Sequence, residues 1–310
     1  MTIICGMDFS DGADNATRAA GALARRLGVP LKLVHVIAES TLPFSLAEPE
    51  AREELLQGAL DAKADNLRAL FSIDVETVLL RGRPDERLTA YAASCKARLL
   101  VVSSLGMKAQ QHWLVGSVAE RVAQRSEIPV LVVRDAAGIE AWAREERALR
   151  VMVGTDLGTT SMGALRWVAG LRRLLACDVC IAQIAWPIGE HARLGIKGQV
   201  ELEGLRPEVQ EVLERELREW TGALEGRGTT TFVVRAGWGR IDSHLAQLAT
   251  ELGVDVLVVG THQRAWAARA WQGSVSRGAI HYATSNVACV PPSWNATGEL
   301  PVHSGVVQSD

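Results

Sequence analysis

One pattern occurs twice in this chain, and this repeat restricts the fold more than any other feature of the sequence. An apolar run that ends in Gly-x-Asp opens the chain at residues 3–8, as IICGMD, and returns at 151–156, as VMVGTD. Further on, an apolar run, a loop and the dipeptide Gly-Ser occur at 99–117 and again at 256–274. Self-similarity of this kind indicates two copies of one structural unit. The 310 residues are enough for two domains of about 150 residues each.

Within each copy, apolar runs alternate with amphipathic segments. In the first copy we expect strands at 3–7, 31–37, 75–80, 99–102 and 128–133, and helices at 15–27, 49–70, 85–96 and 117–125. The second copy repeats the order at 151–154, 161–176, 179–184, 207–224, 230–235, 241–252, 256–259, 274–282 and 287–290. Strands that alternate with helices imply right-handed crossovers and a parallel sheet covered on both faces.

The predicted fold class is therefore α/β, with two doubly wound domains that each hold a five-stranded parallel sheet with helices on both faces. We expect the first domain at 1–136, a short helical linker at 137–149, the second domain at 150–292 and a loose tail at 293–310.

Ligands of doubly wound sheets bind beyond the carboxyl ends of the strands, so the residues that follow the first, second and fourth strands are the candidates. They are Asp8, Ile37, Ser103, Gly106, Gly116 and Ser117 in the first copy, and Asp156, Gly260, Gly273 and Ser274 in the second. Glycine lets the backbone approach a ligand closely, and the N–H groups at the start of a helix attract anions such as phosphates. The Ser117 hydroxyl can cap its helix or donate to a phosphate oxygen.

Two of these candidates have equally ordinary structural interpretations. Asp8 can order the turn that follows the first strand by accepting hydrogen bonds from nearby N–H groups. Ile37 can be an apolar strand end like any other. The sequence alone leaves both interpretations open.

The spacing Ser103-x2-Gly106-x9-Gly116-Ser117 resembles the nucleotide-binding signature of the universal stress protein family, Gly-x2-Gly-x9-Gly-Ser/Thr, with serine at the first glycine. The second copy, Gly260-x2-Gln263-x9-Gly273-Ser274, lacks the middle glycine instead. The resemblance extends over most of the chain. It also includes the turn Gly82-x-Pro84, which the second copy replaces by Gly237-x-Gly239.

The resemblance implies a stress-response protein that binds ATP, with or without Mg²⁺, on a fold like that of the adenine nucleotide alpha hydrolases. It implies that Asp8 and Asp156 contact the nucleotide or its metal, and that the backbone near Ile37 meets the adenine. Family members pair domains through their last strands. Here the two halves would form that pair within one chain, with a homodimer as a further option. The protein partner stays unknown.

The two copies are not equivalent as nucleotide sites. Gln263 adds bulk where the signature has glycine, and at a position of positive φ it would cost about 1 kcal/mol. We therefore expect ATP chiefly in the first domain. One alternative is a nucleotide-independent scaffold, or a binder of small apolar ligands near tryptophans such as Trp186. Another is a slow ATP-hydrolysing enzyme. We assign no catalytic residue and no metal site, because the sequence has no P-loop, no G-x-S-x-G and no paired histidines on a helix.

Composition excludes some broad classes of protein. The net charge of −3 argues against nucleic acid as a partner, and no apolar run approaches the roughly 18 residues of a membrane span. The five cysteines are an odd, scattered set, typical of reduced thiols. We interpret Cys177 and Cys180, spaced as C-x-x-C, as ordinary thiols at a helix end and in the next strand. These observations favour a cytoplasmic protein.

Overall fold

The computed structural model describes residues 2–38, 49–104, 116–200, 204–261 and 275–294. The elements of the first half are β1 (Ile3–Gly6), α1 (Asp11–Leu27), β2 (Leu31–Ile37), α2 (Pro49–Phe71), β3 (Val75–Arg81), α3 (Pro84–Ser94), β4 (Leu99–Ser103), α4 (Ser117–Arg125), β5 (Val130–Val133) and α5 (Ala137–Ala143). The elements of the second half are β6 (Leu149–Gly154), the 3₁₀ turn η1 (Thr159–Ser161), α6 (Met162–Leu174), β7 (Cys177–Ala185), α7 (Pro187–Arg193), α8 (Pro207–Thr221), β8 (Thr230–Ala236), α9 (Ile241–Glu251), β9 (Val256–Gly260), α10 (Val275–Tyr282) and β10 (Asn286–Val290).

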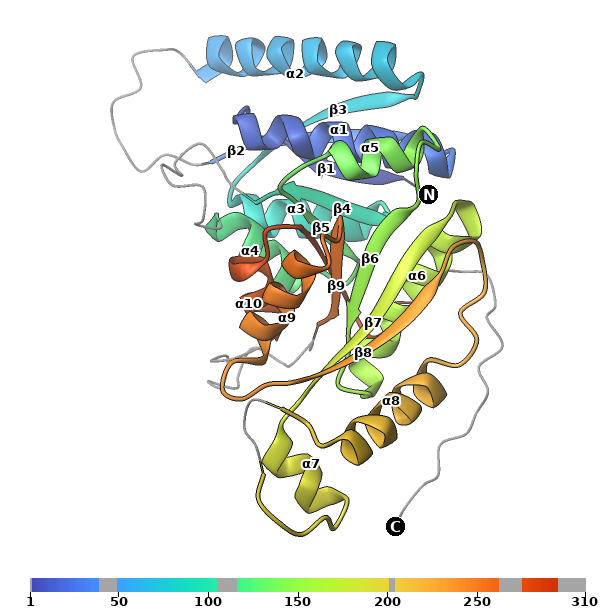
Figure 1. Cartoon of the computed structure of the whole chain (residues 1–310). Helices are drawn as coiled ribbons and strands as arrows, with labels where there is room; N and C mark the ends of the chain where they lie inside the picture. Colours follow the sequence, from blue (N-terminus) through green and yellow to red (C-terminus); the bar gives the residue numbers. More distant parts are fainter. Residues whose placement is uncertain (1, 39–48, 105–115, 201–203, 262–274, 295–310) are drawn as a thin grey trace.

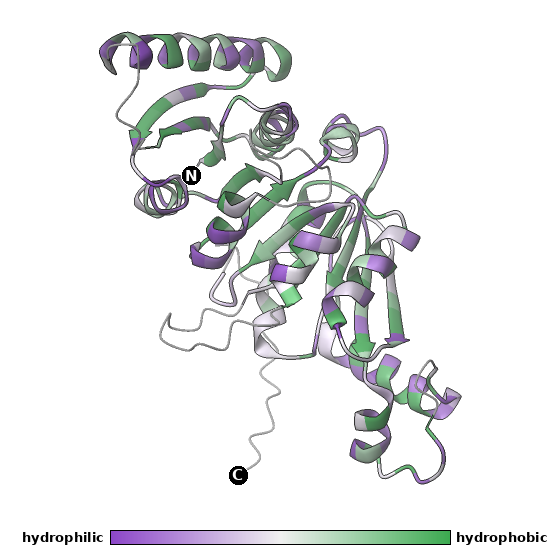
Figure 2. Cartoon of the chain, turned by 90° about the vertical axis from the view of Figure 1, so that its left-hand side faces the viewer, coloured by the Kyte–Doolittle hydropathy of each residue, from purple (hydrophilic) through white to green (hydrophobic). Residues whose placement is uncertain are grey.

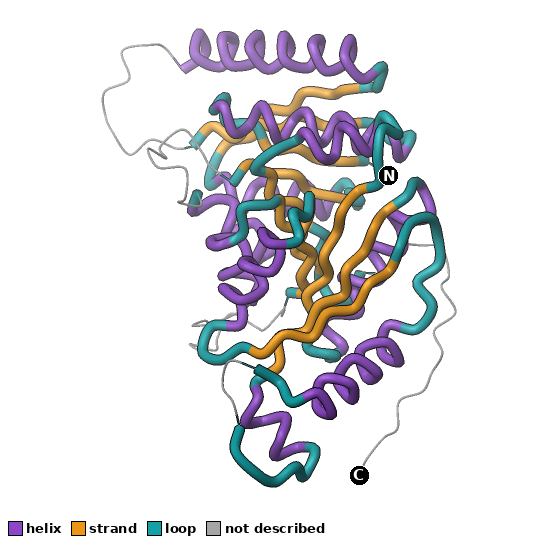
Figure 3. The backbone as a smooth tube through the Cα atoms, viewed as in Figure 1, coloured by secondary structure: helices purple, strands orange, loops and turns teal. Residues whose placement is uncertain are grey.

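The ten strands in the described part of the chain form one sheet, in the order β3-β2-β1-β4-β5-β10-β9-β6-β7-β8. Neighbouring strands within each half are parallel, whereas β5 and β10 pair antiparallel where the halves meet. Figures 1 and 3 show this sheet running through the middle of the molecule, with the first half at the top and the second below. The doubly wound order and the pairing of the last strands within one chain are therefore confirmed.

The strands are apolar on both faces because helices cover both faces. On one face, buried strand residues such as Ile3 and Cys5 belong to a core that also includes residues of α1, α2, α5, α6 and α8. On the other face, Ile4 belongs to a core that also includes residues of α3, α4, α9 and α10. Figure 2 shows the apolar strands between helices whose outer sides are more polar. A parallel sheet with crossover helices on both faces requires strands that are apolar at successive positions, and these strands meet that requirement.

The segment between the halves contributes to the core. In α5, Ile139 and Trp142 are fully buried, and the Trp142 indole Nε1 donates to the Ala176 carbonyl of the second half at 3.0 Å. On the side facing α1, Glu140 accepts two hydrogen bonds from Arg18, at 2.7 and 2.6 Å. The segment expected to be a short helical linker does form a helix, and α5 contacts both halves through these residues.

Local sequence signals explain the ends of α1. Its N-cap is Ser10, whose hydroxyl accepts from the Ala13 N–H at 3.2 Å, and its C-cap is Gly28 at φ 61°. Within the helix, Gly21 lies against the Phe71 ring of α2, where an added Cβ would come within 2.5 Å of the ring.

Some expected details are wrong. Cys177 begins β7 and does not end the preceding helix, because the strand starts two residues earlier than its apolar run suggests. The third helix was expected to begin at Asp85, but α3 begins at Pro84, with Arg83 in the N-cap position. Asp85 is instead a buried ion-pair partner of α4. The short helix α7, with Pro187 in its first turn, was not expected at all.

Candidate functional site

The two candidate aspartates take the same position in their halves, in the turns after β1 and β6. Asp8 Oδ1 accepts from the Ser10 N–H at 3.1 Å and from the Ser10 hydroxyl at 2.6 Å. Asp156 Oδ1 accepts from the Gly158 N–H and the Ser161 hydroxyl, both at 2.9 Å. Each aspartate therefore orders its turn, as the structural interpretation expected, and this role does not exclude a ligand contact.

The residue after each aspartate has a left-handed backbone. Phe9 and Leu157 both have φ 61°, although neither is glycine. This conformation costs roughly 1–2 kcal/mol for a residue with a Cβ. Backbone strain that recurs at equivalent positions, next to the carboxyl end of the sheet, is typical of a functional site. In the first half the Phe9 ring packs on His35, with ring centroids 4.9 Å apart.

The first half brings the end of β4 and the start of α4 together. The Ser104 carbonyl accepts from the Gly116 N–H at 2.8 Å, and this bond closes the loop between them. Ser103 and Ser117 therefore lie beside the same edge of the sheet as Asp8, because β1 and β4 are parallel neighbours. The strand order reverses between β1 and β4, which is where doubly wound sheets bind their ligands.

Ile37 lies at the carboxyl end of the neighbouring strand β2 and is half-buried. Its carbonyl accepts from the Gly82 N–H at 3.0 Å, so the fold itself uses this acceptor. Gly82 has φ 123°, a conformation that favours glycine, and this explains why the turn before α3 carries that residue.

Positive charge gathers behind the start of α4. The Asp85 carboxylate is buried and pairs with Arg125 at 2.6 Å, with Arg121 at 3.3 Å and with Arg83 at 3.4 Å. Arg121 also donates to the Ser117 hydroxyl at 3.2 Å. A guanidinium held by a buried carboxylate thus lies next to the serine that the signature places at a phosphate.

The second half holds a defined cavity at the equivalent place. Its volume is about 160 Å³. Its wall combines backbone and polar groups at one side with aliphatic side chains at the other: Gly154, Thr155, Asp156, Thr160, Ser161, Ile184, Ile241, Leu245, Val259, Gly260, Val275 and Ser276. The structure therefore brings Asp156 and Gly260 together.

Gly260 has a structural reason to be glycine. An added Cβ would lie 2.3 Å from the Thr160 carbonyl oxygen, so η1 packs directly on this residue. In the first half the same position is Ser103. Packing against η1 therefore requires glycine at position 260, independently of any contact with a ligand.

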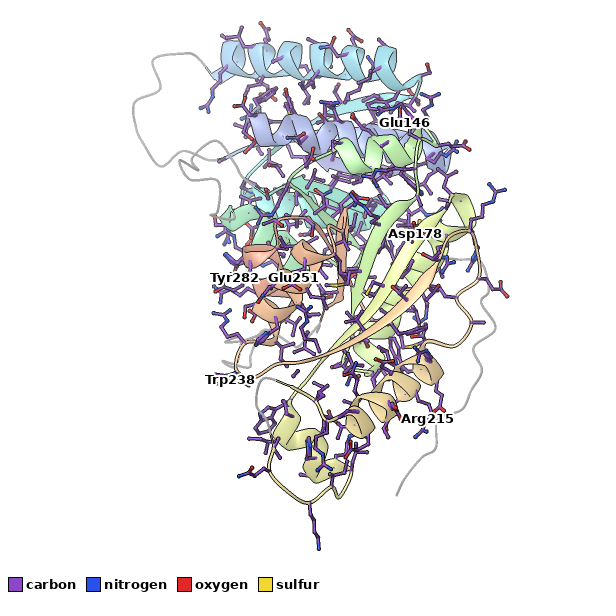
Figure 4. The ribbon with its side chains drawn as sticks, viewed as in Figure 1. Glu146, Asp178, Arg215, Trp238, Glu251 and Tyr282 are labelled. Atoms are coloured by element: carbon purple, nitrogen blue, oxygen red, sulfur yellow. The ribbon has the colours of Figure 1, made fainter. Side chains whose placement is uncertain are left out.

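The charge network behind the site also differs between the halves. Asp242, the counterpart of Asp85, pairs with Arg240 at 2.6 Å. The residue of α10 equivalent to Arg121 is Gly278, and an added Cβ there would come within 1.6 Å of the Asp242 carboxylate. Tyr282 replaces Arg125, and the Arg240 guanidinium lies 4.8 Å from its ring centroid (Figure 4). Gly278 therefore supplies no guanidinium at the position where Arg121 faces Ser117 in the first half.

Three predicted site residues, Gly106, Gly273 and Ser274, lie outside the described residues, as does Gln263. Sequence reasoning missed the buried hydroxyls of Ser161 and Ser276 in the second-half cavity. Ser276 could have been found from its place two residues after the Gly-Ser pair. No sequence pattern marks Ser161, because the 3₁₀ turn determines where its side chain points.

The part of the chain that the structure describes holds no group of three His, Cys, Asp or Glu side chains able to bind a metal. Its helices include none that is long and apolar enough to cross a membrane. Burial raises the pKa of the Cys177 and Cys289 thiols to about 12.

Comparison with known proteins supports the fold and the repeat. The family model described as the universal stress protein family matches twice, at residues 1–134 and 148–291. A universal stress protein of Thermus aquaticus is 33% identical over 136 residues, which are 43% of this chain and 98% of that protein. One from Methanocaldococcus jannaschii is 28% identical over 139 residues, covering 43% of this chain and 81% of that protein.

Solved structures resemble the chain over nearly its whole length. A universal stress protein of Archaeoglobus fulgidus has a TM-score of 0.66 at 15% identity, covering 94% of this chain and 98% of that one. A functionally unknown protein of Pseudomonas aeruginosa has a TM-score of 0.54 at 12% identity, covering 94% and 92%. Such low identities show a shared fold only. Because the family model matches both halves, this chain belongs to the universal stress protein family, as a tandem member with two copies of the domain.

Proposed function

We propose that the protein is a stress-response regulator that binds ATP, chiefly in its first half. One observation carries this proposal: Ser117, at the start of α4, receives a hydrogen bond from Arg121 beside the point where the strand order reverses. A helix N-terminus with a hydroxyl and a guanidinium supplies the donors that phosphate oxygens accept. The second half has Gly278 where the first has Arg121.

The remaining residues would hold the other parts of the nucleotide. Asp8, next to the strained Phe9, would meet the ribose or a Mg²⁺ ion carried by the phosphates, since Mg²⁺ is usually held by one or two carboxylates together with substrate phosphates. The apolar strand end at Ile37 would face the adenine. No residue is assigned to activate water, so any hydrolysis of ATP would be slow.

The test is calorimetric titration of ATP into matched variants of the two halves. Gly116→Trp places a bulky ring at the start of α4, and Gly273→Trp makes the same change in the second copy of the signature. We expect Gly116→Trp to abolish binding and Gly273→Trp to leave it unchanged. Melting curves establish that both variants are folded. If ATP still binds to Gly116→Trp, the nucleotide site does not lie in the first half.

A finer pair of variants tests the phosphate contact. Ser117→Ala removes one hydrogen bond to a charged group, which is worth about 1.5–3 kcal/mol, or roughly a tenfold loss of ATP affinity or more. Adenosine lacks phosphates, so its affinity should change little. Ser274→Ala is the matched control. Equal losses for ATP and adenosine would contradict a phosphate contact at Ser117.

The second-half cavity favours a different ligand as a second candidate. Five of its wall residues are aliphatic. Trp186 lies exposed in the turn after β7, and Trp238 lies exposed in the turn after β8 (Figure 4). A small planar ligand with a polar group would fit these walls. Calorimetry with indole as the probe, on the wild type and on Ile241→Phe, tests this. Saturable binding that is lost in Ile241→Phe is expected, and an absence of binding to the wild type would refute it.

A further inference from the structure

The surface that joins the two halves consists of Glu120 and residues 129–135 on the first half, and Arg277 and residues 286–292 on the second. We infer that this joining surface is selective for unlike halves. Each half fits the other half of this chain and disfavours pairing with the same half of a second copy. The inference does not depend on nucleotide binding. It rests on three places where equivalent residues of the two copies differ in a complementary manner.

The geometry of the joining surface is that of a pseudo-twofold axis. In β5 and β10 the pairs are Val130–Cys289, Leu131–Ala288 and Val132–Val287. Equivalent residues of the two copies are 157 positions apart in this region, as Gly116 and Gly273 are. Leu131 is therefore paired with its own equivalent, Ala288, and the axis passes between these two residues. A twofold dimer of one half would bring each axial residue against itself.

The first difference is in volume. Leu131 and Ala288 lie opposite each other on the α1 and α6 face, and both are fully buried. Two copies of the first half would place leucine against leucine in this space, and two copies of the second would place alanine against alanine. Interiors tolerate neither extra methyl groups nor cavities well. Only the mixed pair keeps the observed volume.

The second difference is in charge, on the opposite face of the sheet. Glu120 of α4 pairs with Arg277 of α10 at 2.8 Å, and these two residues are also equivalents on the axis. His281 adds a contact to the same carboxylate at 3.0 Å. A dimer of first halves would oppose two glutamates, and a dimer of second halves two arginines. Like charges at such a contact suppress the wrong pairing.

The third difference is in hydrogen bonding. The Asn286 amide oxygen accepts from the backbone N–H groups of Arg134 at 2.8 Å and Asp135 at 3.0 Å, and its amide nitrogen donates to the Asp135 carbonyl at 2.8 Å. The equivalents of Arg134 and Asp135 in the second half are Pro291 and Pro292. Proline has no N–H group, so a dimer of second halves would leave this amide oxygen without its donors.

The reciprocal mismatch appears in the first half. The residue equivalent to Asn286 is Pro129, which carries no side-chain acceptor. A dimer of first halves would therefore leave the N–H groups of Arg134 and Asp135 without the amide. These hydrogen bonds are part-buried, so leaving the two backbone N–H groups without their acceptor costs free energy. Volume, charge and hydrogen bonding thus all favour the same partner.

The first test uses the intact chain. Arg277→Glu opposes two carboxylates, and Glu120→Arg opposes two guanidinium groups, so each should lower the melting temperature by about 2–4 °C. The exchange Glu120→Arg/Arg277→Glu restores an opposite pair and should recover at least half of the loss. Leu131→Ala/Ala288→Leu should likewise be more stable than the sum of its single variants predicts. Additive losses in both cycles would overturn the inference.

The second test reads partner choice directly. A protease site inserted between Glu145 and Glu146, which are both exposed, allows the folded chain to be cut between the halves. Native mass spectrometry of the cut protein, diluted and reconcentrated, should show one first half bound to one second half. Homodimers of either half in comparable amount would overturn the inference, and so would halves that separate and do not pair again.

Discussion

Two glycines of the same helix should respond oppositely to the same substitution. Gly163 and Gly170 both lie in α6, but their surroundings differ. A Cβ on Gly163 would lie 2.3 Å from the Pro291 carbonyl oxygen and 3.2 Å from the Pro292 Cα, so backbone of the segment after β10 blocks it. A Cβ on Gly170 would meet nothing within 4 Å.

The expected magnitudes follow from these distances. Alanine is about 1 kcal/mol better than glycine inside a helix. For Gly163→Ala the helix or the segment after β10 must move by roughly 1 Å, and overpacking against a fixed backbone costs about 1–3 kcal/mol. We expect a net loss of about 1–2 kcal/mol. Gly170→Ala has no such clash and should gain about 0.5–1 kcal/mol.

The assay is chemical or thermal unfolding of the two variants beside the wild type. About 1 kcal/mol changes the melting temperature of a domain of 150–250 residues by about 2–4 °C. Gly58→Ala in α2, where a Cβ also meets nothing within 4 Å, is a second control. The packing argument is refuted if Gly163→Ala is as stable as Gly170→Ala.

Two further predictions concern titratable groups. Burial raises the pKa of Asp255, but hydrogen bonds from Arg147 and the Arg150 N–H, with the charges of both arginines, lower it further, so its pKa is below the usual value. A depressed carboxyl pKa stabilises the fold above the unfolded pKa of about 3.9, and that stability is lost as the pH falls through the folded pKa. Asp255→Asn should therefore lose less stability than the wild type between pH 5 and pH 2.5 in urea unfolding, and an unchanged acid dependence would contradict this. Of the five cysteines, Cys95 is only half-buried, whereas Cys289 is buried with its pKa raised to about 12. Ellman's reagent at pH 8 should therefore label Cys95 first in the native protein, and rapid labelling of all five thiols would show that the core is open.

The fold was largely predictable because its strongest signals are local and occur twice. Apolar runs bounded by Gly-x-Asp and Gly-Ser mark strand ends, and the alternation with amphipathic segments leaves few parallel topologies. The limits of individual elements were less predictable. Cys177 lies in a strand because Leu149 of β6 pairs with it, and no residue pattern in β7 predicts this pairing.

Two short elements show where local sequence was insufficient. A short helical linker was expected at 137–149, and α5 lies there, but the burial of Ile139 and Trp142, three residues apart, was not expected. The helix α7 follows Trp186, and Pro187 in its first turn was a usable start signal. Both helices are a little under two turns long, too short for periodicity to stand out.

The candidate site was predictable only in part. Asp8 and Asp156 were placed correctly at the carboxyl ends of their strands, yet whether they order the turn was decided by the geometry of Ser10 and Gly158. The contact between Arg121 and Ser117 depends on Asp85, which is distant in sequence. Long-range contacts of this kind leave no pattern in a single sequence.

The two halves should differ in nucleotide binding, and calorimetric titration of ATP into the intact chain measures this difference. The Arg121–Ser117 contact is present in the first half, and Gly278 replaces Arg121 in the second. We therefore predict saturation at about one ATP per chain. Two equal sites per chain, or no binding at all, would contradict the account.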